Sequence, residues 1–326
     1  MRIATFNLEN LDMSSKADPP LADRLAVLRP QLDRLRADIL CLQEVNAQAP
    51  TNRPHGERFL DALDTLLDGT PYAGFARATT VVRSRRTPLD VHNLVILSRW
   101  QITETRQYWN DLVPPPQMRT MSAEPPDDYP AEIRWDRPLL HAVVAPPAGP
   151  PLHVFNMHLR APLAAAIPGQ KESAFVWKSV PGWAEGYYQA AVKRSGQALE
   201  ARFAVDRVFD DDADAVIVVC GDMNAELREM PLRILCADAE DTGNGRLAAR
   251  SLVPLEARVP DSVRYTVRHA GRQLLLDHIL VSRALALRST AVEIHNEALG
   301  DEVVGYAAVH HSPESYHAPI VAAFDD

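Results

Sequence analysis

The sequence predicts an α/β fold in which two β-sheets pack face to face with helices on their outer sides. Two observations carry this prediction. Short apolar runs typical of buried strands alternate with stretches of helical periodicity, and the second half of the chain repeats the pattern of the first. Thr5-Phe6-Asn7, a helix and a strand ending in Gln43-Glu44 parallel Val154-Phe155-Asn156, a helix and a strand ending in Gly221-Asp222. The alternative, that apolar strands look alike by chance, stays open at this point.

Each expected element follows from local periodicity and turn residues. A helix is predicted over residues 21–36, where Pro30 is expected to kink it or end it early, and further helices are predicted over 58–67 and 184–209. The predicted strands span 2–7, 38–45, 91–98, 101–109, 139–144, 152–158, 215–220, 263–267, 273–282, 287–295 and 319–324. We expect one domain over 1–326, with irregular insertions near 111–136 and 160–182.

Composition narrows the class of protein. With 326 residues, 46% of them hydrophobic and 24% charged, the chain is typical of soluble globular proteins. No apolar run approaches membrane-spanning length, and the N-terminal residues lack the apolar region of a secretory signal. The three cysteines have no metal-binding spacing, so we expect a reduced cytoplasmic protein, which we take to be a monomer. The net charge of −9 argues against broad non-specific binding of nucleic acid, although it permits a local basic cleft.

Polar side chains at the ends of predicted strands are the main functional signal. Glu44 follows a buried strand and precedes a polar turn. A carboxylate in such a place suits Mg²⁺, which takes one or two protein carboxylates and keeps water for the rest of its shell. The alternative is a solvated glutamate at a strand end.

The segment Gly221-Asp222-Met223-Asn224 follows a strongly apolar run. Glycine permits a sharp exit from the strand, and Asp222 and Asn224 would point to the same side of an extended chain. Hydrolysis of a phosphate ester needs a group that orients or deprotonates water and a neutral donor to a phosphate oxygen, and this pair supplies both. A turn that merely caps the strand is the alternative.

Histidines beside predicted strands complete the set of candidates. A neutral histidine needs a partner that fixes its tautomer, and a carboxylate serves this purpose while raising the basicity of the imidazole. Asp277-His278 and Tyr316-His317 lie late in the chain, and His158 ends a predicted strand. His278 is expected to be a packed core histidine.

Together these segments resemble the endonuclease/exonuclease/phosphatase family, which includes DNase I-like nucleases, exonuclease III-like repair enzymes, sphingomyelinases and inositol-polyphosphate phosphatases. The resemblance covers nearly the whole chain, and the Gly221-Asp222-Met223-Asn224 segment is its most specific motif. It implies the four-layered α/β sandwich of the DNase I-like fold. It also implies a phosphoesterase that depends on Mg²⁺ or Mn²⁺.

The resemblance assigns the metal-binding side of the site. Glu44 matches the main metal ligand, and Asn7 matches an asparagine that supports the metal and the phosphate. Glu9 matches a position that is acidic in some members. Tyr316 is a departure, because most members have aspartate there and tyrosine is a poor Mg²⁺ ligand at neutral pH. Glu314, two residues upstream, is the expected substitute.

The resemblance also assigns the phosphate-binding side. Asp222 matches the aspartate that positions the attacking water, with Asn224 beside it. Asp277 is expected to hold His317, which would contact the scissile phosphate. His158 matches a histidine that donates to the phosphate in DNase I-like members.

The expected reaction is hydrolysis of a phosphodiester by in-line attack of water, on a phosphate-ester substrate for which nucleic acid is the first choice. A phosphatase or a phospholipid or sphingomyelin phosphodiesterase of the same family is the alternative. A non-catalytic member that serves as a binding scaffold is a second one, and Tyr316 is its direct support. Further phosphates could meet Arg83, Arg85, Arg86, Arg134 or Arg137, although charge runs in loops are usually solvated, and Arg160 is better placed for a phosphate contact. Trp177, Trp183, Tyr187 and Tyr188 could stack on bases, press against a lipid or pack a lid onto the core.

Overall fold

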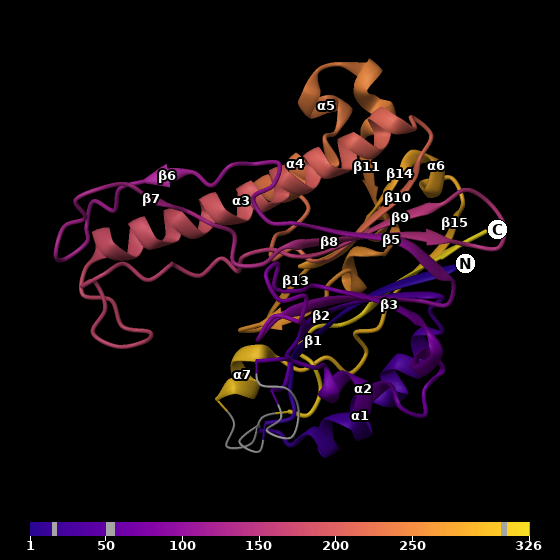
Figure 1. Cartoon of the computed structure of the whole chain (residues 1–326), viewed down its shortest axis with the longest axis horizontal. Coiled ribbons are helices and arrows are strands. Elements are labelled where there is room, and N and C mark those ends of the chain that lie inside the picture. The colour runs from indigo at the N-terminus through magenta and orange to yellow at the C-terminus, as the bar shows by residue number, and fades with distance from the viewer. Residues whose placement is uncertain (15–17, 50–55, 308–311, 326) are drawn as a thin grey trace.

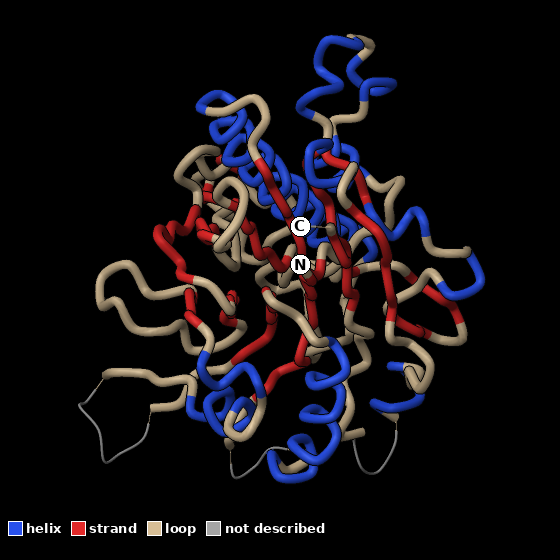
Figure 2. Tube along the Cα trace, turned by 90° about the vertical axis from the view of Figure 1, so that its right-hand side faces the viewer, coloured by secondary structure: helices blue, strands red, loops and turns tan. Residues whose placement is uncertain are grey.

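The computed structural model describes residues 1–14, 18–49, 56–307 and 312–325. Within these ranges, two six-stranded mixed sheets lie against each other, with helices on both outer sides (Figure 1). Seen after a quarter turn, the strands fill the middle of the molecule and the helices lie around them (Figure 2). The predicted four-layered α/β sandwich is confirmed.

The first sheet has the strand order β15-β16-β1-β2-β4-β3. In that order the strands span Ser289–Ile294, Ile320–Phe324, Arg2–Leu11, Ile39–Val45, Asn93–Ser98 and Ala76–Thr79. β1 and β2 are parallel, and the other neighbours are antiparallel. Apolar side chains on the outer face pack against α1 (Leu21–Leu35) and α2 (Asp61–Leu67).

The second sheet has the order β11-β14-β10-β9-β8-β5. In that order its strands span Leu252–Pro254, Asp277–Ser282, Val216–Asp222, Leu152–His158, Leu139–Ala145 and Gln101–Tyr108. β9 and β10 are parallel, and the other neighbours are antiparallel. The outer face of this sheet packs against α3 (Val180–Asp211) and α4 (Met230–Cys236).

The internal repeat is confirmed by the topology. In the first sheet, β16-β1-β2-β4 contains two parallel strands joined through α1, and β8-β9-β10-β14 of the second sheet has the same arrangement, joined through α3. The apolar core between the sheets draws on both halves, with Ile3 and Ile39 from one side and Val154, Val218 and Ile279 from the other.

Shorter elements decorate this frame. The two-residue strands β6 and β7 pair beside the part of α3 that projects beyond the sheets (Figure 1). The remaining helices and strands are β6 (Gln117–Met118), β7 (Ala131–Glu132), α5 (Ala239–Thr242), β12 (Val267–His269), β13 (Arg272–Leu274), α6 (Arg283–Ala286) and α7 (Glu302–Tyr306). The 3₁₀ turns are Pro71–Gly74, Gly245–Arg250, Leu255–Arg258 and Asp261–Val263. No helix among the described residues has the length and apolarity needed to cross a membrane.

Of the two outcomes expected at Pro30, the early end of the helix is wrong, and two strand predictions also need correction. Pro30 lies inside α1 without ending it, because Leu28, Leu32 and Leu35 stay buried against the sheet on both sides of the proline. The strand predicted over 263–267 is wrong, since a 3₁₀ turn occupies Asp261–Val263 and β12 starts only at residue 267.

The strand predicted over 273–282 is split into β13 and β14. The hydroxyl of Thr266 accepts hydrogen bonds from the backbone N–H groups of Leu276 and Asp277, each at 3.1 Å. These two amides are thereby satisfied by a side chain instead of by a neighbouring strand, which interrupts the ladder.

Candidate active site

Strand pairing places the predicted site residues at one edge of the sandwich. Asn7 of β1 lies opposite Gln43 of β2. In the other sheet, Asp222 of β10 lies between His158 of β9 and Asp277 of β14. Side chains alternate along a strand with a period of two. Asp222 therefore continues the inward-facing row of Val218 and Cys220, which belong to the core between the sheets.

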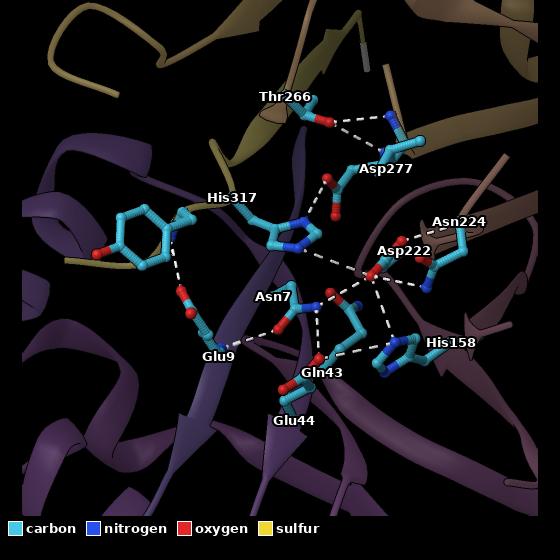
Figure 3. Close-up of polar contacts among 12 residues, drawn as sticks. Asn7, Glu9, Gln43, Glu44, His158, Asp222, Asn224, Thr266, Asp277 and His317 are labelled. Atoms are coloured by element: carbon cyan, nitrogen blue, oxygen red, sulfur yellow. Dashed lines mark hydrogen bonds and ion pairs between the residues drawn. The ribbon is translucent and has the colours of Figure 1, made fainter. Parts of the chain in front are cut away.

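Glu44 breaks this alternation. As the neighbour of inward-facing Gln43 it should point outward, but its backbone is left-handed, with φ of 59°. Its carboxylate consequently faces the other sheet: Oε1 accepts a hydrogen bond from Asn7 Nδ2 at 3.2 Å, and Oε2 accepts from the backbone N–H of Asn10 at 3.1 Å (Figure 3). A non-glycine residue held in this conformation is typical of functional sites.

Asp222 receives hydrogen bonds from both sheets. Its Oδ2 accepts from Asn7 Nδ2 at 3.1 Å and from Asn224 Nδ2 at 3.2 Å, and its Oδ1 accepts from the backbone N–H of Asn224 at 2.9 Å. Asn224 reaches it through a left-handed turn, with φ of 47°, and not through extended chain as the sequence suggested. Gly221 is required here, since a Cβ would come within 1.9 Å of the carbonyl oxygen of Met157.

Asp277 and His317 form the predicted pair. His317 Nδ1 lies 2.9 Å from Asp277 Oδ2, and His317 Nε2 lies 3.9 Å from Asp222 Oδ2. Burial lowers the pKa of His317, but the carboxylates of Asp277 and Asp222 outweigh it and raise that pKa well above its usual value. His317 is thus a protonated donor at neutral pH, pointing toward Asp222 (Figure 3).

Burial shifts the pKa values of Asp222 and His158 in opposite directions. Burial raises the pKa of Asp222 to about 7, against the charge of His317, while the carboxylate of Asp277 adds to the rise. Burial, together with the positive charge of Arg137, lowers the pKa of His158 well below its usual value. His158 is therefore neutral, and its Nε2 lies 3.3 Å from Asp222 Oδ2 and 3.7 Å from Glu44 Oε1.

Two groups of side chains in the described part of the chain have the spacing of metal ligands. One group consists of Glu44, His92 and His158, and the other consists of Asp222, Asp277 and His317. In each group the possible ligand atoms lie within 4.8 Å of one another. Carboxylate oxygens and imidazole nitrogens facing one space fit a divalent ion. Asp277 Oδ1 and His92 Nδ1 are buried without a hydrogen-bond partner, which leaves each available to a ligand.

Glu9 and Glu314, the other two expected metal ligands, belong to neither of these two groups, which were identified among the residues that the structure describes. The carboxylate of Glu9 accepts a hydrogen bond from the backbone N–H of Tyr316 at 2.7 Å. The Tyr316 side chain is buried and packs against α7, where a Cβ on Gly305 would come within 1.8 Å of its hydroxyl oxygen. The tyrosine thus occupies space beside α7.

Sequence reasoning missed His92. β4 runs antiparallel to β2, with Asn93 opposite Val45, so the beginning of β4 lies at the same edge as the end of β2. A polar residue that directly precedes an antiparallel strand is therefore a usable signal, because the beginning of such a strand lies beside the ends of its neighbours. Burial lowers the pKa of His92, Arg137 lowers it further, and Glu44 opposes both.

The basic candidates differ in their surroundings. Arg137 is largely buried and donates to the carbonyl oxygen of Leu159 at 3.3 Å. Burial lowers the pKa of Arg137, against the charges of Glu44 and Asp222. Arg160 forms an ion pair with Asp136 at 3.5 Å.

The aromatic candidates lie on and beside α3. Trp183 and Tyr187 stack on each other with ring centroids 5.6 Å apart. Trp177 packs against α3 at Gly186, where a Cβ would meet its ring at 3.0 Å, which favours the packing interpretation for this tryptophan.

Comparisons with known proteins agree with this geometry. The model of the Endonuclease/Exonuclease/phosphatase family matches residues 4–301. Similar solved structures include an AP endonuclease from Archaeoglobus fulgidus, with 18% identity, a TM-score of 0.52 and all of both chains covered. A second is a mannosyl-6-phosphatase from Bacteroides thetaiotaomicron, with 15% identity, a TM-score of 0.59 and all of both chains covered. A third is truncated TDP2 from Caenorhabditis elegans, with 14% identity and a TM-score of 0.55, and the match covers 100% of this chain and 97% of that one.

No curated protein sequence matches the chain. At these identities the solved structures establish the fold alone, whereas the family model spans most of the sequence and includes Asn7, Glu44, His158, Asp222 and Asp277, although its match ends before His317. The chain belongs to the endonuclease/exonuclease/phosphatase family.

Proposed function

We propose that this protein is a divalent-metal-dependent phosphoesterase that hydrolyses phosphodiester bonds. The observation that carries the proposal is the surroundings of Asp222, whose carboxylate lies beside a protonated histidine, a neutral histidine and two amides. A carboxylate with a pKa of about 7 is suited to act as a general base near neutral pH.

Each side chain has a role that its contacts support. Asp222 would orient the attacking water and accept its proton, while Asn7 and Asn224 fix the carboxylate in place. His317, held by Asp277, would donate to a non-bridging phosphate oxygen, and His158 would donate to another.

Glu44 is the proposed main ligand of Mg²⁺ or Mn²⁺. When bound, the ion supplies neutralisation of the charge on the phosphoryl oxygens. Asn7 and the backbone N–H of Asn10 hold the Glu44 carboxylate in the inward-facing position that this role requires. Glu9 would support the site indirectly, through its hydrogen bond to the backbone of Tyr316.

Nucleic acid is the first candidate substrate. Two of the similar structures are described as an AP endonuclease and as a 3′ phosphatase bound to a DNA hairpin, which supports this choice. Another is described as a mannosyl-6-phosphatase, so a phosphatase is the second candidate. A phospholipid or sphingomyelin phosphodiesterase is the third. We favour catalysis over a binding scaffold, because the proposed base, donors and metal ligand converge at one edge.

The test is hydrolysis of bis-p-nitrophenyl phosphate, DNA, RNA, sphingomyelin and a sugar phosphate with Mg²⁺, Mn²⁺ or EDTA. We expect turnover of a diester with metal, none with EDTA, and a loss of at least about a hundredfold in Asp222→Asn. Asp325→Asn, an exposed carboxylate near the C-terminus, is the control and should retain full activity. Full activity in Asp222→Asn would refute the proposal.

A further inference from the structure

His92 is the residue at this edge whose placement the proposed reaction leaves unexplained. It directly precedes β4, and its backbone is left-handed, with φ of 56°. Its backbone N–H donates to Asn46 Oδ1 at 3.0 Å, which holds the turn in place. A β-carbon makes this conformation unfavourable, so a residue held there has a compensating contact elsewhere.

The imidazole of His92 is directed at Glu44 without bonding to it. His92 Nδ1 lies 3.7 Å from Glu44 Oε2, which is too long for a hydrogen bond. The same nitrogen is buried and has no hydrogen-bond partner. A buried acceptor or donor without a partner is destabilising. A ligand bound between the two side chains would offset this cost.

The distance between the two side chains indicates that the bound group is a metal ion. Two donor atoms that bind one metal ion at about 2.1 Å each lie about 3–4 Å apart, depending on the angle at the ion. The 3.7 Å between His92 Nδ1 and Glu44 Oε2 falls in this range. Glu44 Oε1 lies at the same distance, 3.7 Å, from His158 Nε2 on the other side of the carboxylate.

We infer that His92 joins Glu44 as a ligand when the bound ion accepts imidazole, as Co²⁺ and Zn²⁺ do, and that it does not contribute to the binding of Mg²⁺ at the same site. Mg²⁺ is hard and takes oxygen ligands, whereas imidazole suits the later transition metals. His158 keeps the role of phosphate donor proposed above. The inference rests on the proposed function only in taking Glu44 as the metal ligand.

The experiment measures metal binding directly and needs no substrate. The metal-free protein is titrated calorimetrically with Co²⁺, Zn²⁺ and Mg²⁺, and the Co²⁺-loaded protein is examined by proton NMR for shifted, solvent-exchangeable histidine N–H signals. His92→Asn is the main variant, because asparagine tolerates the left-handed backbone. His92→Gly is the second, since glycine adopts it without strain.

The matched control is His269→Asn. His269 ends β12 and also presents Nδ1 to a glutamate, at 2.8 Å from Glu302 Oε2, but this pair is exposed and belongs to neither group of candidate metal ligands in the described part of the chain. The His269→Asn substitution should leave the affinity for Co²⁺, Zn²⁺ and Mg²⁺ unchanged.

We expect both His92 variants to bind Co²⁺ and Zn²⁺ about tenfold or more weakly, to bind Mg²⁺ within about twofold of wild type, and to lose one shifted histidine signal. Equal weakening for all three ions would overturn the inference, because His92 would then only shape Glu44. Wild-type protein whose Co²⁺ form shows no shifted histidine signal would also overturn it, whatever the variants do. Inactive protein that shows the signal would instead count against the proposed function alone.

Discussion

The side-chain amide of Asn7 bonds to Asp222, 215 residues away, and so joins the two sheets at the site: Asn7 Nδ2 lies 3.1 Å from Asp222 Oδ2. The same nitrogen lies 3.2 Å from Glu44 Oε1. One amide therefore sets the distance between the proposed base and the proposed metal ligand. Asn7→Ala should lower turnover by about tenfold to a hundredfold, since both carboxylates lose a shared donor. Steady-state kinetics with a diester substrate checks this, and turnover equal to wild type would contradict it.

The pair of Asp277 and His317 should behave as one unit. His317→Ala removes a protonated donor, for which we expect a loss of about a hundredfold to a thousandfold in kcat. Asp277→Asn should cost less, and the double variant should be little worse than His317→Ala, because Asp277 acts through the histidine. Kinetic measurement of the double-mutant cycle tests the coupling. Effects that simply add would show that the two residues act separately.

The Asp222 carboxylate, which the proposed reaction needs, should lower the stability of the folded protein at neutral and higher pH. Its pKa is about 7 in the folded protein and 3.8 in its reference state, so its folded-state pKa is raised. The stability that it contributes is present below pH about 4 and is lost as the pH rises through about 7. Metal-free Asp222→Asn should therefore be more stable than wild type at pH 8, by about 2–4 kcal/mol, and the gain should vanish near pH 4. Chemical denaturation at the two pH values measures both differences.

His141 should make the protein sensitive to acid. Burial, followed by the charge of neighbouring His153, lowers its pKa to about 3, and the ring stacks on Phe155 with the ring centroids 4.0 Å apart. A histidine with a depressed pKa is stable as the neutral form, so its contribution is lost as the pH falls from about 6.5 toward 3. The cost is about 1.4 kcal/mol per pH unit in that window. His141→Phe should flatten the fall in Tm between pH 6.5 and 4.5, and an unchanged slope would exclude His141 as the cause.

Glu200 should hold the insertion near 111–136 in place. This buried carboxylate accepts hydrogen bonds from the backbone N–H groups of Asn110, Asp111 and Leu112 and from Trp135 Nε1, at 2.6–3.0 Å. Glu200→Ala leaves these donors unsatisfied and should cost about 2–4 kcal/mol. Arg119 and Arg134 are exposed in this segment, so its loosening in the variant should speed cleavage there by trypsin, and limited proteolysis measures this against wild type.

The repeat of the two halves and the strand-end positions of Asp222 and His158 were predictable because an apolar run that turns polar marks the end of a buried strand. The roles of Asn7 and Asp277 follow instead from the family resemblance, and Asp277 begins β14 at the break in the strand predicted over 273–282. Glu44 was found as a residue, but its inward direction depends on a left-handed backbone that no periodicity encodes. The place of His92 at the site was not predicted, because His92 precedes its strand instead of following one. The break in the 273–282 strand depends on the Thr266 hydroxyl, which belongs to a distant segment, and such tertiary contacts override local propensity.

One level below the site, Gln43 Nε2 lies 2.7 Å from Asn156 Oδ1, and Asn156 Nδ2 bonds to the carbonyl oxygens of Leu42 and Val95, each at 2.9 Å. The N–H groups of these buried amides reach these partners only in one alignment of the sheets, since a slip of one residue would turn Asn156 toward the helices. A mispacked sandwich would leave them stranded in an apolar interior. The same contacts that disfavour wrong alignments during folding also hold the strands beneath the site in place, so adaptation to different substrates has to come from the loops around it.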